Sequence, residues 1–135
     1  MKSKSILTQT EVTQILAAAR KEAQANGWAV SIAVTDDGGH LLGFERLDGC
    51  APIGSYIAIE KARTSALGRR ESKGYEEMVN GGRTAFVTAP LLTSLEGGVP
   101  LIVDGETIGA VGVSGVKADQ DAQVAKAGVA ALNAG

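Results

Sequence analysis

The chain has little of what metal centres and disulfide-stabilised folds are built from. Its 135 residues include one cysteine, Cys50, and one histidine, His40. A lone cysteine permits no internal disulfide, and a lone histidine cannot build a zinc site of the His/Cys type. The sequence therefore predicts no metal site, and it favours the cytoplasm over an oxidising compartment.

Aromatic residues and an excess of charge of one sign are also scarce. Phe, Trp and Tyr make up 4% of the chain, and 13 basic residues mix with 15 acidic ones to give a formal net charge of -2. The stacking platforms and basic stripes typical of nucleic-acid-binding proteins are thus missing. No stretch approaches the roughly 18 apolar residues of a membrane span. We expect neither a nucleic-acid nor a membrane partner, and no signal peptide.

What the chain does have is enough apolar sequence for one domain. Apolar residues make up 44% of it, and only 3 prolines are present. The 18 glycines are scattered through apolar segments instead of being gathered in a linker. We therefore expect a single domain over residues 1–135, without internal repeats.

Hydrophobic periodicity predicts an alternation of helices and hairpins. Thr8 and Glu11 have the spacing of a capping box, which predicts the start of a helix. The turn sequences Asp36 to Gly39 and Asp104-Gly105 separate runs that alternate with period two, so each is predicted to join two hairpin strands. The expected elements are a helix ending near Asn26-Gly27, strands over 28–35 and 40–47, a helix from Pro52 to about Ala66, a short helix over 75–79, strands over 99–103 and 106–114, and a last helix over 118–132. An antiparallel sheet covered by helices, the α+β class, follows from this order.

Three stretches carry a resemblance to a known family. They read VTDDGGHLLGFERLDG at 34–49, EKART at 60–64 and GVPLIVDGETIGAVGVSG at 98–115. In this order they resemble the GlcG/HbpS-like proteins, also found as the carboxy-terminal domain of PduO. The resemblance implies an α+β fold in which a profilin-like antiparallel sheet of about five strands is sandwiched by helices, and assembly into a homo-oligomer. It also implies a small-molecule ligand, because some members bind haem and others accompany the catabolism of small acids.

Arg46 and Asp48 are the first candidate ligand-binding residues. Arg46 is expected at the end of a strand, where a guanidinium binds a carboxylate through two parallel hydrogen bonds. Haem propionates and small organic acids both suit it. The structural alternative is an ion pair of Arg46 with Asp48 or Glu45. Lys61 is a further candidate for binding an anion, with the alternative of a helix lysine whose stem packs on apolar surface.

His40 is the candidate catalytic residue. It is the only side chain that titrates near neutral pH without help, so acid–base catalysis or imidazole ligation of haem iron would use it. Asp36 and Asp37 are candidates for orienting it, although residues of such turns commonly cap their own backbone. The alternative is an exposed histidine of a hairpin. Tyr56 and Tyr75 are further candidates for contacting haem iron.

Residues beside glycine-rich turns complete the candidate ligand-binding set. Ser114 and Gly115 precede the last helix, where backbone N–H groups can bind an anion. The alternative is that glycine there permits close packing by another backbone. Glu96, before Gly97-Gly98, is a candidate for the mouth of a site, with a capping role as the alternative.

Two functions remain open from the sequence. The first is binding of haem, or assistance in its degradation, with Arg46 and Lys61 as anchors for the propionates. The second is a small cofactor-independent enzyme or accessory protein of organic-acid or aromatic catabolism. In that function Arg46 holds a substrate carboxylate and His40 or a nearby carboxylate moves a proton.

Overall fold

The structure is a computed structural model that describes residues 1–133. Its elements are α1 (Gln9–Ala25), β1 (Ser31–Asp36), β2 (Leu41–Arg46), α2 (Ile53–Gly68), α3 (Lys73–Asn80), the 3-10 helix η1 (Thr84–Thr88), β3 (Gly98–Val103), β4 (Glu106–Ser114) and α4 (Ala118–Asn133). The predicted capping box begins α1, with the Thr8 N–H donating to the Glu11 carboxylate at 2.9 Å. Within this range, no helix combines the length and apolar character needed to cross a membrane.

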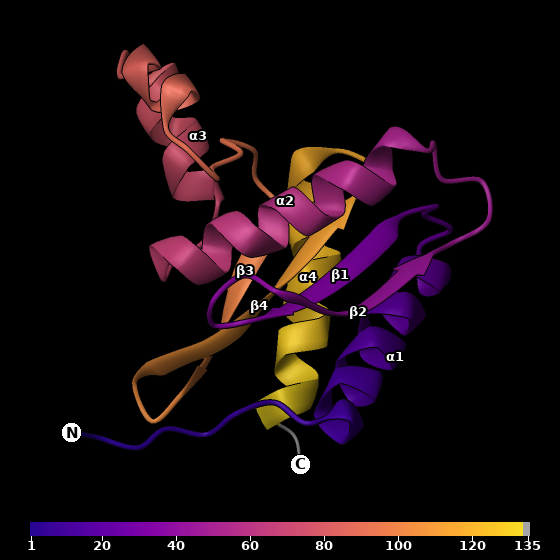
Figure 1. Cartoon of the computed structure of the whole chain (residues 1–135). Coiled ribbons are helices and arrows are strands. Elements are labelled where there is room, and N and C mark those ends of the chain that lie inside the picture. The colour runs from indigo at the N-terminus through magenta and orange to yellow at the C-terminus, as the bar shows by residue number, and fades with distance from the viewer. Residues whose placement is uncertain (134–135) are drawn as a thin grey trace.

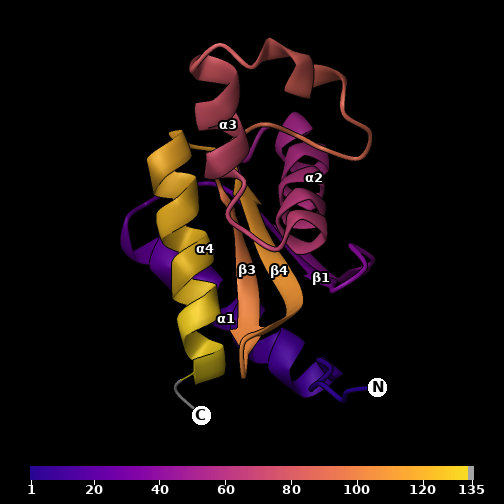
Figure 2. The same cartoon turned by 90° about the vertical axis from the view of Figure 1, so that its left-hand side faces the viewer.

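A four-stranded antiparallel sheet forms the middle layer, in the order β2-β1-β4-β3. One face is covered by α2, and the other by α1 and α4 (Figure 1 and Figure 2). The predicted α+β class is thus confirmed. The expectation of about five strands is wrong, because the chain between α2 and β3 folds as α3 and η1 and none of the described residues supplies a fifth strand. Breaks at Gly81-Gly82 and Pro90 leave no alternating apolar run there.

The larger core lies between the sheet and the layer of α1 and α4. Alternation along the strands directs Ile32 and Val34 of β1 into this core, beside Val111 and Val113 of β4. The helices contribute apolar residues at helical spacing. Other buried members of this core are Val12, Ile15, Ala19, Ala23, Leu101, Val124 and Ala125.

On the opposite face, small residues bring the backbone of α2 very close to the sheet. Ala58 and Ala62 of α2 are fully buried there. A Cβ atom added at Gly112 of β4 would lie 2.1 Å from the carbonyl oxygen of Ala58 and 2.4 Å from the nitrogen of Ala62. One added at Gly98 of β3 would lie 2.3 Å from the carbonyl oxygen of Lys61. Glycine at these positions therefore lets helix and strand backbones touch.

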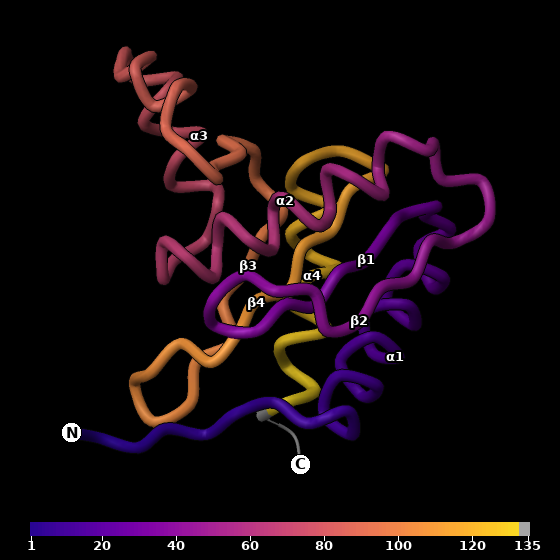
Figure 3. The backbone as a smooth tube through the Cα atoms, in the orientation of Figure 1, coloured from indigo at the N-terminus to yellow at the C-terminus, as the bar shows by residue number. Residues whose placement is uncertain are grey.

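The residues before α1 form an extended strap along one end of the sheet (Figure 3). Lys2 pairs with Glu106 beside the β3–β4 turn, and Lys4 binds the carboxylate of Asp37 in the β1–β2 turn. The hydrogen bond from Lys4 is the main cause that holds the pKa of Asp37 below its usual range. The strap is thus bound to both hairpin turns of the sheet.

α3 and η1 form an arm that projects from the three layers (Figure 1). Tyr75 is the buried residue of α3, with the Arg70 guanidinium 4.2 Å above its ring and the ring of Phe86 at 5.9 Å. η1 buries none of its residues, and Val87 is 63% exposed. The arm therefore adds little to either core.

We predict that Gly112→Ala will lower the free energy of unfolding by about 2–3 kcal/mol, because the added methyl group overlaps backbone atoms of α2. Gly74→Ala is the matched control, since a Cβ atom there meets nothing closer than Arg70 Cδ at 3.8 Å. That change lies inside α3 and should be neutral or stabilising by about 0.5–1 kcal/mol. Urea unfolding of both variants measures the difference, and equally small effects would contradict the close contact.

Candidate functional site

The single histidine lies in the turn between β1 and β2, where Asp36 holds it. One carboxylate oxygen of Asp36 accepts the backbone N–H groups of Gly38 and His40, each at 2.9 Å, and lies 3.1 Å from His40 Nδ1. The second ring nitrogen, Nε2, lies on the side of the imidazole away from this carboxylate. Since the His40 side chain is 80% exposed, this nitrogen is accessible to a ligand.

A mostly apolar hollow of about 510 Å³ opens beside this turn. The residues that line it are Gly38, Gly39, His40, Leu41, Ile59, Arg63, Leu67 and Leu91. Turn and helix meet closely, because a Cβ atom at Gly39 would lie 2.8 Å from Arg63 Cγ. Sequence reasoning missed the helical wall, although Ile59, Arg63 and Leu67 recur every four residues along α2, which is the spacing of one helix face.

Arg63 supplies the positive charge of the hollow. Its Nη1 lies 3.0 Å from the carboxylate of Glu60, three residues earlier in α2, and its side chain is 32% exposed. A guanidinium carries five N–H donors, so the pair with Glu60 leaves donors for an anionic group of a ligand. The hollow therefore combines apolar walls, an imidazole nitrogen and a guanidinium.

Arg46 is held at the opposite end of β2. Its Nε and Nη2 donate to the carbonyl oxygen of Cys50 at 3.1 and 2.9 Å. The neighbouring Glu45 pairs instead with Arg20 of α1. The guanidinium of Arg46 thus fixes the corner between β2 and α2 through a backbone carbonyl, a partner that the sequence did not indicate.

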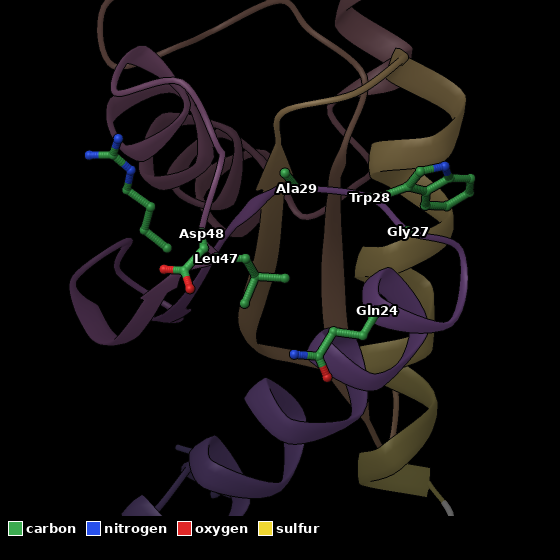
Figure 4. Close-up of a pocket in the computed structure, with 7 residues that line it drawn as sticks. Gln24, Gly27, Trp28, Ala29, Leu47 and Asp48 are labelled. Carbon is green, nitrogen blue, oxygen red and sulfur yellow. The ribbon is translucent and has the colours of Figure 1, made fainter.

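A second hollow, of about 420 Å³, lies beside Arg46. It is lined by Gln24, Gly27, Trp28, Ala29, Arg46, Leu47 and Asp48. Figure 4 shows Gln24 of α1 on one side of this space, with Leu47 and Asp48, which follow β2, on the other. The structure therefore brings two of the predicted residues, Arg46 and Asp48, to one polar hollow.

His40 and Arg46 do not share a site. β2 separates them, and six residues of extended chain span about 20 Å. A small acid held by Arg46 therefore lies beyond the reach of the imidazole. The sequence did not indicate this separation. The two residues are on one face of the predicted strand, but they lie at its two ends.

Lys61 lies in the interior and not on the surface of α2. Its Nζ donates to the carbonyl oxygen of Val113 at 2.9 Å and to the carboxylate of Asp121 at 3.0 Å. Asp121 also accepts the N–H of Val116 at 3.1 Å. Burial raises the pKa of Asp121, against the opposing effect of Lys61, and the charge of the half-buried Glu96 adds to the rise. This ion pair ties α2 to β4 and to the first turn of α4.

Ser114 and Gly115 lie where β4 leaves the sheet. The carbonyl oxygen of Ser114 is 3.7 Å from the thiol of buried Cys50. Gly115 has φ +151°, and a Cβ atom there would lie 2.4 Å from the carbonyl oxygen of Ala29. These contacts favour the close-packing alternative for Gly115, and ligand binding by this pair stays a prediction.

Neither tyrosine lines the His40 hollow. Tyr56 is 75% exposed on α2, whereas Tyr75 is 8% exposed beneath Arg70. Among residues 1–133, no group of three or more His, Cys, Asp or Glu side chains is placed to hold a metal ion. An exogenous ligand such as haem would bring its own metal.

Comparisons with known proteins identify the family. A family model described as "Haem degrading protein HbpS-like" matches residues 7–130, so the chain belongs to the HbpS-like family. It is 72% identical to the protein GlcG of Escherichia coli K12 over 114 residues, which cover 84% of this chain and 85% of that protein. An uncharacterised 15.0 kDa protein of Citrobacter freundii is 32% identical over 130 residues, covering 88% and 92%. The resemblance seen in the motifs is thereby confirmed.

Solved structures of similar sequence share the whole fold. The crystal structure of a PduOC:haem complex aligns with a TM-score of 0.86 and 25% identity over 96% of each chain. The crystal structure of HbpS aligns with a TM-score of 0.88 and 30% identity, covering 98% of this chain and 94% of that one.

We predict that breaking the buried ion pair of Lys61 and Asp121 will lower stability to an extent that depends on pH. Lys61→Met leaves the Asp121 carboxylate buried without its cation, and should lower the free energy of unfolding by about 3–5 kcal/mol at neutral pH. Folded Asp121 then binds a proton more tightly than the unfolded chain does, so the loss should shrink as the pH falls towards about 5. Denaturant titrations at neutral pH and at about pH 5 measure how much the free energy of unfolding of Lys61→Met falls below that of the wild type. Adding Asp121→Leu should recover part of the loss, and no recovery would contradict the pairing.

Proposed function

We propose that this protein binds haem in the hollow beside His40. The observation that carries the proposal is the position of His40, whose Nδ1 lies 3.1 Å from the Asp36 carboxylate at the edge of an apolar hollow. Metal-ligating histidines commonly have a carboxylate on their other ring nitrogen, which fixes the ring and increases its basicity. The family description and the PduOC:haem complex support the same ligand.

The side chains around the hollow suit the parts of a haem. Leu41, Ile59 and Leu67 offer apolar surface to the macrocycle, and Arg63 offers N–H donors to a propionate. His40 Nε2 is a ligand of the kind that binds haem iron. The volume of about 510 Å³ lies within the roughly 300–1,000 Å³ of small-molecule pockets.

Each residue would have a separate task in such a site. Bound haem supplies a redox-active iron. The protein's own contribution is to orient the imidazole of His40 through the contact of Nδ1 with the Asp36 carboxylate, to neutralise a propionate with Arg63, and to exclude water from one face of the macrocycle with α2. Arg63 takes the anchoring role that the sequence predicted for Arg46 and Lys61, because those two lie at the far end of β2 and in the core.

A hemin titration followed by absorbance tests the proposal. The wild-type protein should give a saturable Soret shift. His40→Ala should change the spectrum and weaken binding by about tenfold or more, whereas Arg63→Met should weaken binding and keep the spectrum. Arg83→Met, at an exposed arginine that does not line the hollow, is the matched control and should bind like the wild type. Unsaturable binding by the wild type, or an unchanged His40→Ala spectrum, would refute this site.

The hollow beside Arg46 favours a second candidate function, the binding of a small carboxylic acid in organic-acid or aromatic catabolism. Arg46 keeps N–H donors beyond the two that bind the Cys50 carbonyl oxygen. Gln24 and Asp48 add polar groups to the same hollow. Because His40 is remote, any proton transfer there would fall to a carboxylate such as Asp48.

We predict that a panel of short-chain carboxylic and hydroxycarboxylic acids will contain members that raise the melting temperature of the wild type but not of Arg46→Ala. Arg46→Lys keeps the charge without the fork and should show a smaller rise. Ligand-induced shifts that are equal in all three proteins would assign Arg46 to the β2–α2 corner alone.

A further inference from the structure

We propose that Arg69 is a positioning residue for His40, which it serves by clamping the β1–β2 turn against the end of α2. The inference rests on the proposed haem site, because it concerns how that site is held in place. Arg69 neither lines the hollow nor contacts the imidazole. Its effect would pass through the backbone of the turn.

The clamp is a pair of hydrogen bonds from one guanidinium nitrogen. Arg69 Nη1 donates to the carbonyl oxygen of Asp37 at 2.6 Å and to that of Ala66 in the last turn of α2 at 2.9 Å. Asp37 directly follows Asp36, the residue that holds His40. The guanidinium therefore connects the helix that forms one wall of the hollow to the turn that carries the imidazole.

The left-handed backbone conformation of Arg69 indicates that its side chain has a role at this position. Arg69 caps α2 in the left-handed conformation, with φ +59° and ψ +31°. Glycine is the usual residue at such a helix end, because any Cβ atom is strained there. An arginine in this place adds strain that glycine would avoid, and backbone strain of this kind is typical of functional sites. The clamp on Asp37 is the contact that glycine could not make.

The remaining polar contacts of the turn lie within it or come from the strap. Asp36 bonds to Gly38 and His40 are internal to the turn. Lys4 of the strap binds the Asp37 carboxylate and the carbonyl oxygen of Thr107 in β4, so it does not connect the turn to α2. Gly39 meets Arg63 by packing alone. Among the described residues, Arg69 thus makes the polar link between turn and helix, and we expect it to hold the turn in place on the helical wall that Gly39 meets by packing.

Arg69→Gly separates positioning from folding. The change removes the guanidinium and relieves the left-handed backbone, so the melting temperature should stay the same or rise. Hemin affinity should fall by about tenfold if the turn then spends about a tenth of its time in the binding position, and the Soret band should move towards that of His40→Ala. Arg83→Gly, on the arm, is the matched control and should bind hemin like the wild type.

A lower melting temperature with an unchanged hemin spectrum would show a purely structural role and overturn the inference. Hemin binding by Arg69→Gly with wild-type affinity and spectrum would overturn it as well.

A measurement without haem keeps the inference separate from the proposed function. The chain has one histidine, so the ring protons of His40 give a single set of NMR signals. These signals should shift or broaden in Arg69→Gly and stay in place in Arg83→Gly. Signals that match the wild type in both variants would refute the clamp, even if hemin binds. If the wild type fails to bind hemin but the His40 signals shift in Arg69→Gly, only the haem site is refuted.

Discussion

The backbone of α2 lies in direct contact with the sheet, and this contact determines where several other parts of the fold lie. Without side chains at Gly112 and Gly98, the helix lies directly on β4 and β3. This close approach fixes the height of α2 above the sheet, and with it the position of Arg63 beside the β1–β2 turn. The same approach carries Lys61 inward to Asp121. A larger residue in the seam would therefore disturb the core and the hollow together.

The two hairpins, the helix ends and the α+β class could be predicted from sequence because they rest on local signals. Turn dipeptides, period-two alternation and the capping box act within a few residues. The fate of Lys61 depends on Val113 and Asp121, more than fifty residues away in the sequence. Likewise, the pairing of Arg46 with a carbonyl oxygen depends on how the chain turns after β2. Long-range packing of this kind leaves no local signal.

The same distinction explains what sequence reasoning did not anticipate about the site. His40 and Arg46 are six positions apart and were predicted on one face of one strand, which favoured a shared site. The length of β2 excludes a shared site, because its extended chain separates His40 from Arg46. The wall formed by α2 has a helical signal, but its partner across the hollow is a turn from a different element. A homo-oligomer and a cytoplasmic location, both implied by the family resemblance or the composition, stay predictions.

The arm formed by α3 and η1 has a consequence for diversity within this fold. It rests on the body chiefly through Tyr75 and buries little else. A segment that contributes so little to the cores can change in length and composition without unfolding the sheet and its three covering helices. The domain is therefore divided into the sheet with its covering helices, where substitutions destabilise the fold, and the arm, where they have little effect on stability. New binding preferences could therefore arise on the arm while the scaffold stays the same.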